Sequence, residues 1–398
     1  MQDRGRAYPE RRKPLEHFGI GFLVVFAAAI LTYLCRDFEF MNRMEMTNLD
    51  SWVSFQNPEP RSEIVVVEIT AEEYGSLFHA TSPLKPSSLA ILVWAIAHSS
   101  PKVIGIDMDT TAWPREIRDR VRRYTVTREQ GKATRIPVVW ALGGYSESGL
   151  FALDQIANSN PEDCFAVPAS IEDTDGIVRR YFPEVVADKK RWRGFQRAIL
   201  DASQGHQETC GVTDARGEAV APVKINFRGG RAAFAHITAS VVLGAAFTEA
   251  WRADNPLRGR IVLLGGAYHA ARDRYLTPVG IMTGVDIAAH TVRSAAPGGS
   301  IKDVPEIVFL AVDLLVGIGL VIIAFFTETL WALVGTVVAV PVVAVIASFA
   351  VYQSFGYFAS FIPMLLGVFF HSLIEHIVVY RRMASELKRL RAANAPTV

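Results

Sequence analysis

Cysteine is scarce in this sequence, with Cys35, Cys164 and Cys210 the only three among 398 residues. So few cysteines exclude a disulfide-stabilised scaffold and a cysteine-rich metal site. An oxidising compartment would permit a Cys164–Cys210 disulfide, but whether these two residues pair stays open. Net charge is also nearly absent, at +1 with 41 basic and 40 acidic residues. Nothing in the sequence suggests nucleic-acid binding, so no nucleic-acid partner is expected.

The spacings that mark common catalytic and cofactor sites are missing as well. Gly265-Gly266 follows an apolar run, but no Lys-Ser or Lys-Thr pair comes next, as a phosphate-binding P-loop requires. In the segment HSLIEH, three residues separate His371 from Glu375, whereas an inverted zincin has H-x-x-E-H. No Ser/His/Asp or Cys/His set is recognisable. We therefore expect no enzymatic activity, no cofactor and no metal site.

Long apolar runs are what the sequence has in excess, since hydrophobic residues make up 50% of it. Four runs have about the length of a membrane-spanning helix. We expect a basic tail at 1–17, transmembrane helices at 18–35, 307–326, 330–352 and 358–380, a large domain at 36–306, and a short tail at 381–398. The first run ends in Tyr33-Leu34-Cys35, which is neither an A-x-A nor a lipoprotein cleavage site, so an uncleaved signal anchor is expected.

Basic residues near both termini predict the orientation in the membrane. They are Arg4, Arg6, Arg11, Arg12 and Lys13 in the first tail, and Arg381, Arg382, Lys388, Arg389 and Arg391 in the last. The positive-inside rule places both tails in the cytoplasm. With four crossings of a bacterial inner (plasma) membrane, the 36–306 domain would then be periplasmic, and the lipid bilayer would be the first partner of the chain.

A few ionisable side chains interrupt the apolar runs, namely Asp313, His371, Glu375 and His376. An acid that faces lipid costs at least about 2.5 kcal/mol. Asp313 is therefore predicted to turn toward the first helix, where Thr32, Tyr33 and Arg36 offer donors. For the other three residues two alternatives remain open: polarity at the membrane interface, or a contact inside the helix bundle.

Short buried runs alternate with helical patterns between the first two apolar runs. Strands are predicted at 63–69, 102–107, 136–141, 223–227 and 261–264. Apolar spacing predicts helices at 86–98, 195–202, 237–243 and from 285 onward. The fold expected from this alternation is an α/β domain, with a largely parallel or mixed sheet and flanking helices.

Polar residues lie at the ends of three predicted strands or in the loops that follow them, and these are Asp107, Asp109, Asn226, Arg228, Asp273 and Arg274. The carboxyl ends of parallel strands meet at one edge of a sheet, so the six residues are candidates for a ligand-binding site. Its carboxylates would suit a hard cation or an amine. A plainer interpretation is also open, in which Asp107 caps the next segment and Asp273 pairs with Arg272 or Arg274.

The order of segments resembles the CHASE2 family, the extracytoplasmic sensory domains of bacterial signalling receptors. The similar segments are IVVVEI at 64–69, PKVIGIDMD at 101–109, DTDGIVRRY at 173–181, INFRGG at 225–230, LRGRIVLLGGAYHAARDRYLTPVG at 257–280 and MTGVDIAAHTV at 282–292. Three apolar runs after the domain also resemble that family. The chain departs from the family at Thr81–Pro86, where a Trp-Pro-rich turn is usual.

The resemblance implies that the domain senses an unknown periplasmic ligand or protein. Receptors of this family normally continue into a kinase, a cyclase or another output domain, whereas only eighteen residues follow Tyr380. We therefore expect signalling through a separate cytoplasmic or membrane protein. The alternative is a structural or docking subunit of a bacterial envelope assembly.

Overall fold

The computed structural model describes residues 14–35, 38–56, 62–82, 84–110, 113–129, 132–142, 164–187, 190–206, 212–214, 220–326 and 339–393. The chain divides into two compact units. One is Val53–Ile301, which we call the α/β domain. The other joins Met1–Trp52 with Lys302–Val398, and we call it the helical unit.

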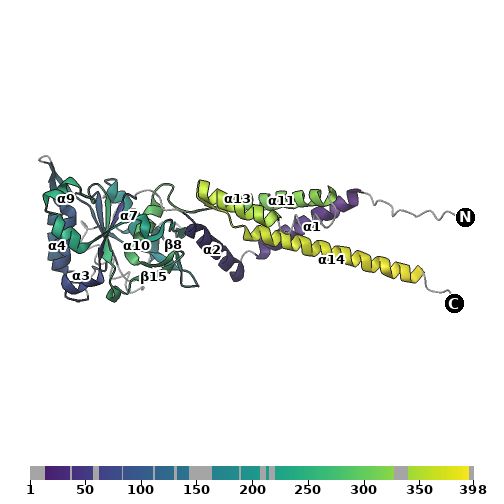
Figure 1. Cartoon of the computed structure of the whole chain (residues 1–398), viewed down its shortest axis with the longest axis horizontal. Coiled ribbons are helices and arrows are strands. Elements are labelled where there is room, and N and C mark those ends of the chain that lie inside the picture. Colours follow the sequence, from purple (N-terminus) through teal and green to yellow (C-terminus); the bar gives the residue numbers. More distant parts are fainter. Residues whose placement is uncertain are drawn as a thin grey trace. The chain divides into compact units, whose positions relative to one another are not determined.

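Six parallel strands form the central sheet of the α/β domain (Figure 1). Their order across the sheet is β13 (Ala235–Thr238), β1 (Ile64–Ile69), β14 (Ile261–Gly266), β2 (Val103–Asp107), β5 (Val138–Ala141) and β6 (Cys164–Ala166). Every neighbouring pair in this order is parallel. This arrangement confirms the predicted α/β fold with a parallel sheet.

Helices cover both faces of the sheet, which explains why its central strands are apolar on both sides. On one face, Val65 and Val67 of β1 pack in a core with α4 (Pro86–His98) and α8 (Ala239–Ala245). On the other, Ile64 and Val66 join α7 (Phe195–Ser203) and α10 (Gly284–Ala295). Figure 1 shows α4 on one side of the sheet and α7 and α10 on the other.

Gly265 lets α10 approach the sheet closely. A Cβ atom at this position of β14 would lie 2.5 Å from Cβ of Val285, in the first turn of α10. Atoms that close overlap, and both belong to rigidly held parts of the chain. The glycine after the apolar run therefore serves helix packing, which is a role sequence analysis could not separate from a turn.

Smaller elements surround the central sheet. The helices are α3 (Ala71–Ser76), α5 (Arg115–Tyr124) and α9 (Glu249–Ala253), with 3₁₀ turns at Gly230–Ala233 and His269–Ala271. The small sheets are β3 (Val126–Glu129) with β4 (Lys132–Arg135), β11 (Val212–Asp214) with β10 (Lys190–Arg193) and β9 (Glu184–Ala187), β12 (Val223–Lys224) with β8 (Val178–Tyr181) and β7 (Ser170–Glu172), and β15 (Arg274–Thr277) with β16 (Gly280–Thr283).

The helical unit contains α1 (Pro14–Cys35), α2 (Glu39–Ser54), α11 (Glu306–Phe326), α13 (Val340–Phe355) and α14 (Ile362–Ala393), with β17 (Lys302–Asp303) paired to β18 (Tyr357–Phe358). Small residues bring its helices together. Gly317 of α11 has no room for a Cβ beside Val25 of α1, and Gly367 of α14 lies next to Thr32 of α1. Such close helix contacts at glycine are common where packing rather than solvent exclusion drives association.

Among the described residues, no helix is both long and apolar enough to cross a membrane. The four predicted spans therefore receive no support from these helices.

The helix bounds also differ from the predicted ones, since α14 continues to Ala393 through the segment predicted as a tail. The reason is its content of Glu, Lys, Arg, Leu and Ala, which favour helix even on an exposed surface.

Four ionisable side chains were predicted within the apolar runs. They are Asp313, His371, Glu375 and His376, and the structure does not describe these side chains. Their predicted contacts stay predictions. Of the donors proposed for Asp313, Arg36 also lies outside the described residues. The Thr32 hydroxyl donates to the carbonyl of Ala28 at 2.9 Å, and Tyr33 is exposed. Cys35 is a free thiol and Cys164 is disulfide-bonded, while Cys210 lies outside the described residues.

Candidate functional site

Two strand ends and two helix starts converge at the carboxyl edge of the sheet. β2 ends at Asp107, which pairs in register with Gly265 of β14. After β14, the chain forms the β15–β16 hairpin and enters α10 at Gly284. Thr283 caps this helix, because its hydroxyl accepts the backbone N–H of Asp286 at 3.4 Å. The strand–loop–helix segment predicted from the sequence thus brings its polar loop to the edge where α/β sheets hold ligands.

A cavity of about 420 Å³ lies at this edge. Its polar lining comes from Asp107, Ser170, Glu172, Gln196, Asp273, Tyr275 and Thr291. The rest of the lining is Pro168, Ala169, Val178, Phe195, Gly284, Ile287 and Ala288. This volume and this mixture of apolar walls with a few polar groups are typical of small-molecule sites. We call it the carboxylate cavity.

Asp107 and Asp273 both line the carboxylate cavity, and the charge of Asp273 acts on Asp107. Burial, and then the charge of Asp273, raise the pKa of Asp107 to about 8. Burial also raises the pKa of Asp273, against the opposing effects of the Tyr275 hydroxyl and the Gly284 backbone. The Asp273 carboxylate lies so close to Gly284 that a Cβ there would overlap it. Two nearby carboxyls with raised pKa values resist simultaneous ionisation.

Tyr275 completes the polar group around this pair. Burial, followed by the charge of Asp273 and a hydrogen bond to it, raises the pKa of Tyr275 to about 12. The phenol therefore stays protonated and serves as a donor to the carboxylate. The charges of Asp107 and Glu172 act on Tyr275 in the same direction. One phenol and three carboxyl groups thus share the carboxylate cavity.

The structure brings together only part of the predicted site. Asp107 and Asp273 line the cavity, whereas Asp109 and Arg274 are exposed and do not line it. Within the described residues, Asp107 accepts no hydrogen bond, and no arginine contributes to the raised pKa of Asp273. The plainer interpretation, with a capping Asp107 and an Asp273–arginine pair, therefore finds no support in these residues.

Asn226 and Arg228 lie at the other end of α10. The backbone N–H of Asn226 donates to the Ser294 hydroxyl at 2.9 Å, and the Asn226 side-chain amide donates to the Gly299 carbonyl at 3.3 Å. Ser294 is ten residues beyond Gly284, and this spacing corresponds to about 15 Å along a helix. The preceding strand, β12, pairs antiparallel with β8 outside the central sheet. The prediction placed Asn226 and Arg228 after a parallel strand. The strand before them is antiparallel, so this part of the predicted site was wrong.

His290 and Arg293 hold that second loop in place. Arg293 donates to the carbonyls of Asn226 at 2.7 Å and of Arg228 at 2.8 Å. His290 is fully buried, with Nε2 3.1 Å from the Gly230 carbonyl. Burial and then the charge of Arg293 lower the pKa of His290 to about 3, so its ring is neutral and donates through one nitrogen. The other nitrogen, Nδ1, also lies 3.1 Å from a carbonyl, that of Asn226. These contacts give the Ile225–Gly230 segment a structural role.

Residues 22–326 match the CHASE2 domain, and this match covers more than half of the 398-residue chain. The chain belongs to the CHASE2 family. No curated protein and no solved structure matches it. CHASE2 domains are sensory domains, which supports the predicted sensor role. The matched residues begin within α1 and end at the last residue of α11, so the family region includes both of these helices.

In this CHASE2 domain, several cavity residues could not be found from the sequence. Glu172 and Val178 come from β7 and β8, and Gln196 comes from the first turn of α7. None of them follows a predicted parallel strand, so no local pattern connects them with Asp107. Tyr275 had a weak signal, because it lies two residues after Asp273 on the same side of an extended strand.

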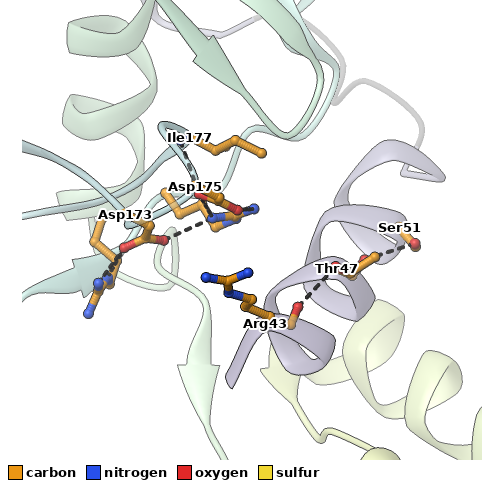
Figure 2. A network of polar contacts seen from close by, with 8 residues as sticks. Arg43, Thr47, Ser51, Asp173, Asp175 and Ile177 are labelled. Carbon is orange, nitrogen blue, oxygen red and sulfur yellow. Dashed lines mark hydrogen bonds and ion pairs between the residues drawn. The ribbon is translucent and has the colours of Figure 1, made fainter. Parts of the chain in front are cut away.

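An acidic turn holds β7 and β8 in their position beside the carboxylate cavity. Figure 2 shows Asp173 and Asp175 around the turn, with the N–H of Ile177 donating to Asp175 at 3.1 Å. Arg179 reaches Asp173 at 3.1 Å and Asp175 at 2.7 Å, and Arg180 also pairs with Asp173. The two arginines pair with these carboxylates, so the D-x-D-G sequence stabilises the turn between β7 and β8.

A second polar cluster lies beside the start of α10. Glu68 of β1 and the buried Asp286 both pair with Arg231. His236 lies 3.7 Å from Glu68 and 3.6 Å from Asp286. A hydrogen bond to His236 and contacts with Arg231 lower the pKa of Glu68 despite its partial burial. Unlike the carboxylate cavity, this cluster balances its acids with basic side chains.

Proposed function

We propose that the chain is a membrane-anchored extracytoplasmic sensor that binds a ligand in the carboxylate cavity. One observation carries the proposal: a CHASE2 domain has a cavity of about 420 Å³ at the carboxyl edge of its sheet, and its described lining includes three acids but no lysine or arginine. Acids partly removed from water without a basic side chain cost free energy, so proteins retain them mainly where a ligand uses them. The sequence contains no recognisable catalytic set, so we propose binding without catalysis.

We propose that the signal of ligand binding leaves the α/β domain through α10. Its residues Gly284, Ile287, Ala288 and Thr291 line the cavity along about two helical turns. This helix is also the last one in the α/β domain, and the chain then continues through a short connection to α11. A ligand that shifts or rigidifies α10 would therefore act on the segment that leaves the domain. A separate cytoplasmic or membrane protein would receive the change.

Membrane anchoring and orientation are proposed from the four apolar runs and the two basic tails. Reporter fusions in a bacterial host are expected to read cytoplasmic at residues 10, 328 and 395, and exported at residues 150 and 355. Alkaline phosphatase and a fluorescent protein, which are active on opposite sides of the membrane, would measure this. An exported signal at residue 395 would contradict the four-span topology.

Binding in the carboxylate cavity can be tested before the ligand is known. The low-molecular-weight fraction of an envelope extract from the native host should raise the melting temperature of the purified full chain. A ligand at about 100 times its Kd stabilises by about 2.7 kcal/mol, or roughly 5–10 °C for a domain of this size. Ala288→Leu, which adds volume to the cavity wall, should abolish the shift.

Ala250→Leu is the matched control, because Ala250 is exposed on α9 and does not line the cavity. This variant should respond to the extract like the unmodified chain. The unfolding transition without extract shows whether each variant is folded. A folded Ala288→Leu chain that keeps the full shift, or an unmodified chain without any shift, would contradict binding in the cavity.

An envelope docking subunit is the second candidate function. Its support is an exposed apolar face, formed by Ile91 and Trp94 of α4, Val241 of α8 and nearby Phe247. The ring centroids of Trp94 and Phe247 lie 4.6 Å apart with the ring planes tilted by 39°, although Trp94 is 40% exposed. Exposed apolar groups of this kind mark protein contacts. A docking subunit would show no shift with the extract and would require this face for assembly.

A further inference from the structure

Several acids of the α/β domain outside the carboxylate cavity pair with a guanidinium: Arg179 pairs with Asp173, Arg193 with Asp201 and Arg231 with Asp286. The buried Glu73 instead accepts the backbone N–H groups of Thr70 and Ser240. The residues that line the carboxylate cavity include Asp107, Glu172 and Asp273 but no lysine or arginine. Asp107 also accepts no hydrogen bond within the described residues, and it faces the cavity. The described lining of the cavity is therefore acidic, and no basic side chain in it offsets the acids.

The lining residues also restrict the chemical class of a ligand that the carboxylate cavity can bind. An anion would meet three carboxyl groups and no cationic side chain, which excludes it on electrostatic grounds. In the described part of the chain, no group of three or more His, Cys, Asp or Glu residues is placed to hold a metal ion. The cavity is also far larger than a bare ion, and Val178, Phe195, Ile287 and Ala288 form an apolar wall. Size and wall together favour an organic cation with an apolar part.

We propose that the carboxylate cavity binds a small organic ammonium ion, with its charged group between Asp107 and Asp273 and its apolar part against α10 and Phe195. The proposal rests on the sensor function and names the ligand class of the same site. Tyr275 keeps its proton and orients Asp273, and its ring offers a second favourable surface for the cation. Glu172 adds a third negative charge at the rim.

Binding exchanges a cation for a proton. In the ligand-free domain, Asp107 holds a proton at neutral pH, and the groups that face it are Asp273, Tyr275 and Glu172. An entering ammonium ion takes the place of this proton between the two carboxylates, and the proton leaves to solvent. No covalent bond of the ligand forms or breaks. Both carboxylates are then ionised and paired, which makes the contacts short and charge-assisted.

Cyclohexylammonium is a suitable probe for calorimetric titration of the purified full chain at pH 7. Three comparison ligands are titrated in the same way: cyclohexanecarboxylate as an anion, cyclohexanol as a neutral molecule and Mg²⁺ as a metal ion. We expect saturable binding of cyclohexylammonium alone. The apparent heat should change with the ionisation enthalpy of the buffer, as expected for release of about one proton per ligand. Asp107→Asn and Asp273→Asn should each weaken binding at least about tenfold.

Asp109→Asn is the matched control, because it makes the same substitution two residues away at an exposed position outside the cavity lining. Its binding should equal that of the unmodified chain. Absence of saturable cation binding overturns the proposal, as does tighter binding of the carboxylate, the alcohol or Mg²⁺. If the host extract still stabilises the chain in a cavity-dependent way, only the ligand class fails. If the extract has no effect, the sensor function fails independently.

Discussion

Asp107→Asn is expected to stabilise the ligand-free chain at pH 8 by about 2–4 kcal/mol. Burial and the charge of Asp273 raise the pKa of Asp107 to about 8. The folded domain therefore retains a proton that the unfolded chain releases above about pH 4. Stability is greatest below about pH 4, falls as the pH rises, and has lost this contribution above about pH 8. Asparagine does not ionise, so the variant avoids the loss.

Denaturant unfolding of the purified full chain at pH 5 and pH 8 would measure this effect. The unmodified chain should lose more stability between the two pH values than Asp107→Asn does. Asp109→Asn, with an exposed carboxyl, should follow the unmodified chain. An Asp107→Asn chain with the same pH dependence as the unmodified chain would show that Asp107 is ionised in the empty cavity. Asp107 would then lower the stability of the ligand-free domain while it strengthens ligand binding. Such a trade of stability for activity is typical of functional residues.

Arg179→Met is expected to destabilise the α/β domain by about 3–5 kcal/mol. The Arg179 side chain is 2% exposed and pairs with both Asp173 and Asp175. Methionine fills much of the same space but leaves the largely buried Asp173 with Arg180 as its remaining basic partner. The cost arises mainly because the Asp173 carboxylate, 9% exposed, keeps only one of these two guanidinium partners, and not from lost packing. Unfolding by denaturant at pH 7 would measure it.

Arg43→Met provides the matched control, and Figure 2 shows Arg43 on α2. Its side chain is 63% exposed and pairs with Glu39, four residues earlier. The same substitution should change stability there by less than about 0.5 kcal/mol. Equal effects of the two substitutions would contradict the importance of the buried pair. Because β7 and β8 carry Glu172 and Val178 to the cavity, Arg179→Met should also weaken ligand binding.

The sequence by itself determined the main strands and helices of the α/β domain. Apolar runs at the positions of β1, β2, β5 and β14 predict buried strands because strands covered on both faces need apolar residues throughout. The predicted helix at 86–98 has the bounds of α4, since its apolar spacing and proline start are local signals. The position of Asp107 at the end of one buried strand and of Asp273 in the loop after another is also local information, whereas their meeting requires β2 and β14 to be neighbours in the sheet.

Edge and accessory strands depended on the tertiary structure. Residues 237–243 were predicted as a helix, but β13 (Ala235–Thr238) precedes α8 there. This prediction was wrong at its start because a four-residue edge strand has one neighbour and little apolar pattern. The predicted strand at 223–227 is only two residues long and belongs to a small antiparallel sheet. Its neighbour β8 lies far away in the sequence, so no local pattern reveals the pairing.

The strand order and the carboxylate cavity were likewise decided by long-range packing. β14 inserts between β1 and β2, and Gly265 allows α10 to pack closely against it at Val285. Neither the strand order nor this helix packing can be predicted from the sequence pattern of a single segment. The cavity wall combines α7, α10, β7, β8 and the β15–β16 hairpin, which are distant in sequence. Local patterns specify which faces must be buried, whereas only the assembled tertiary structure determines where a space remains between them.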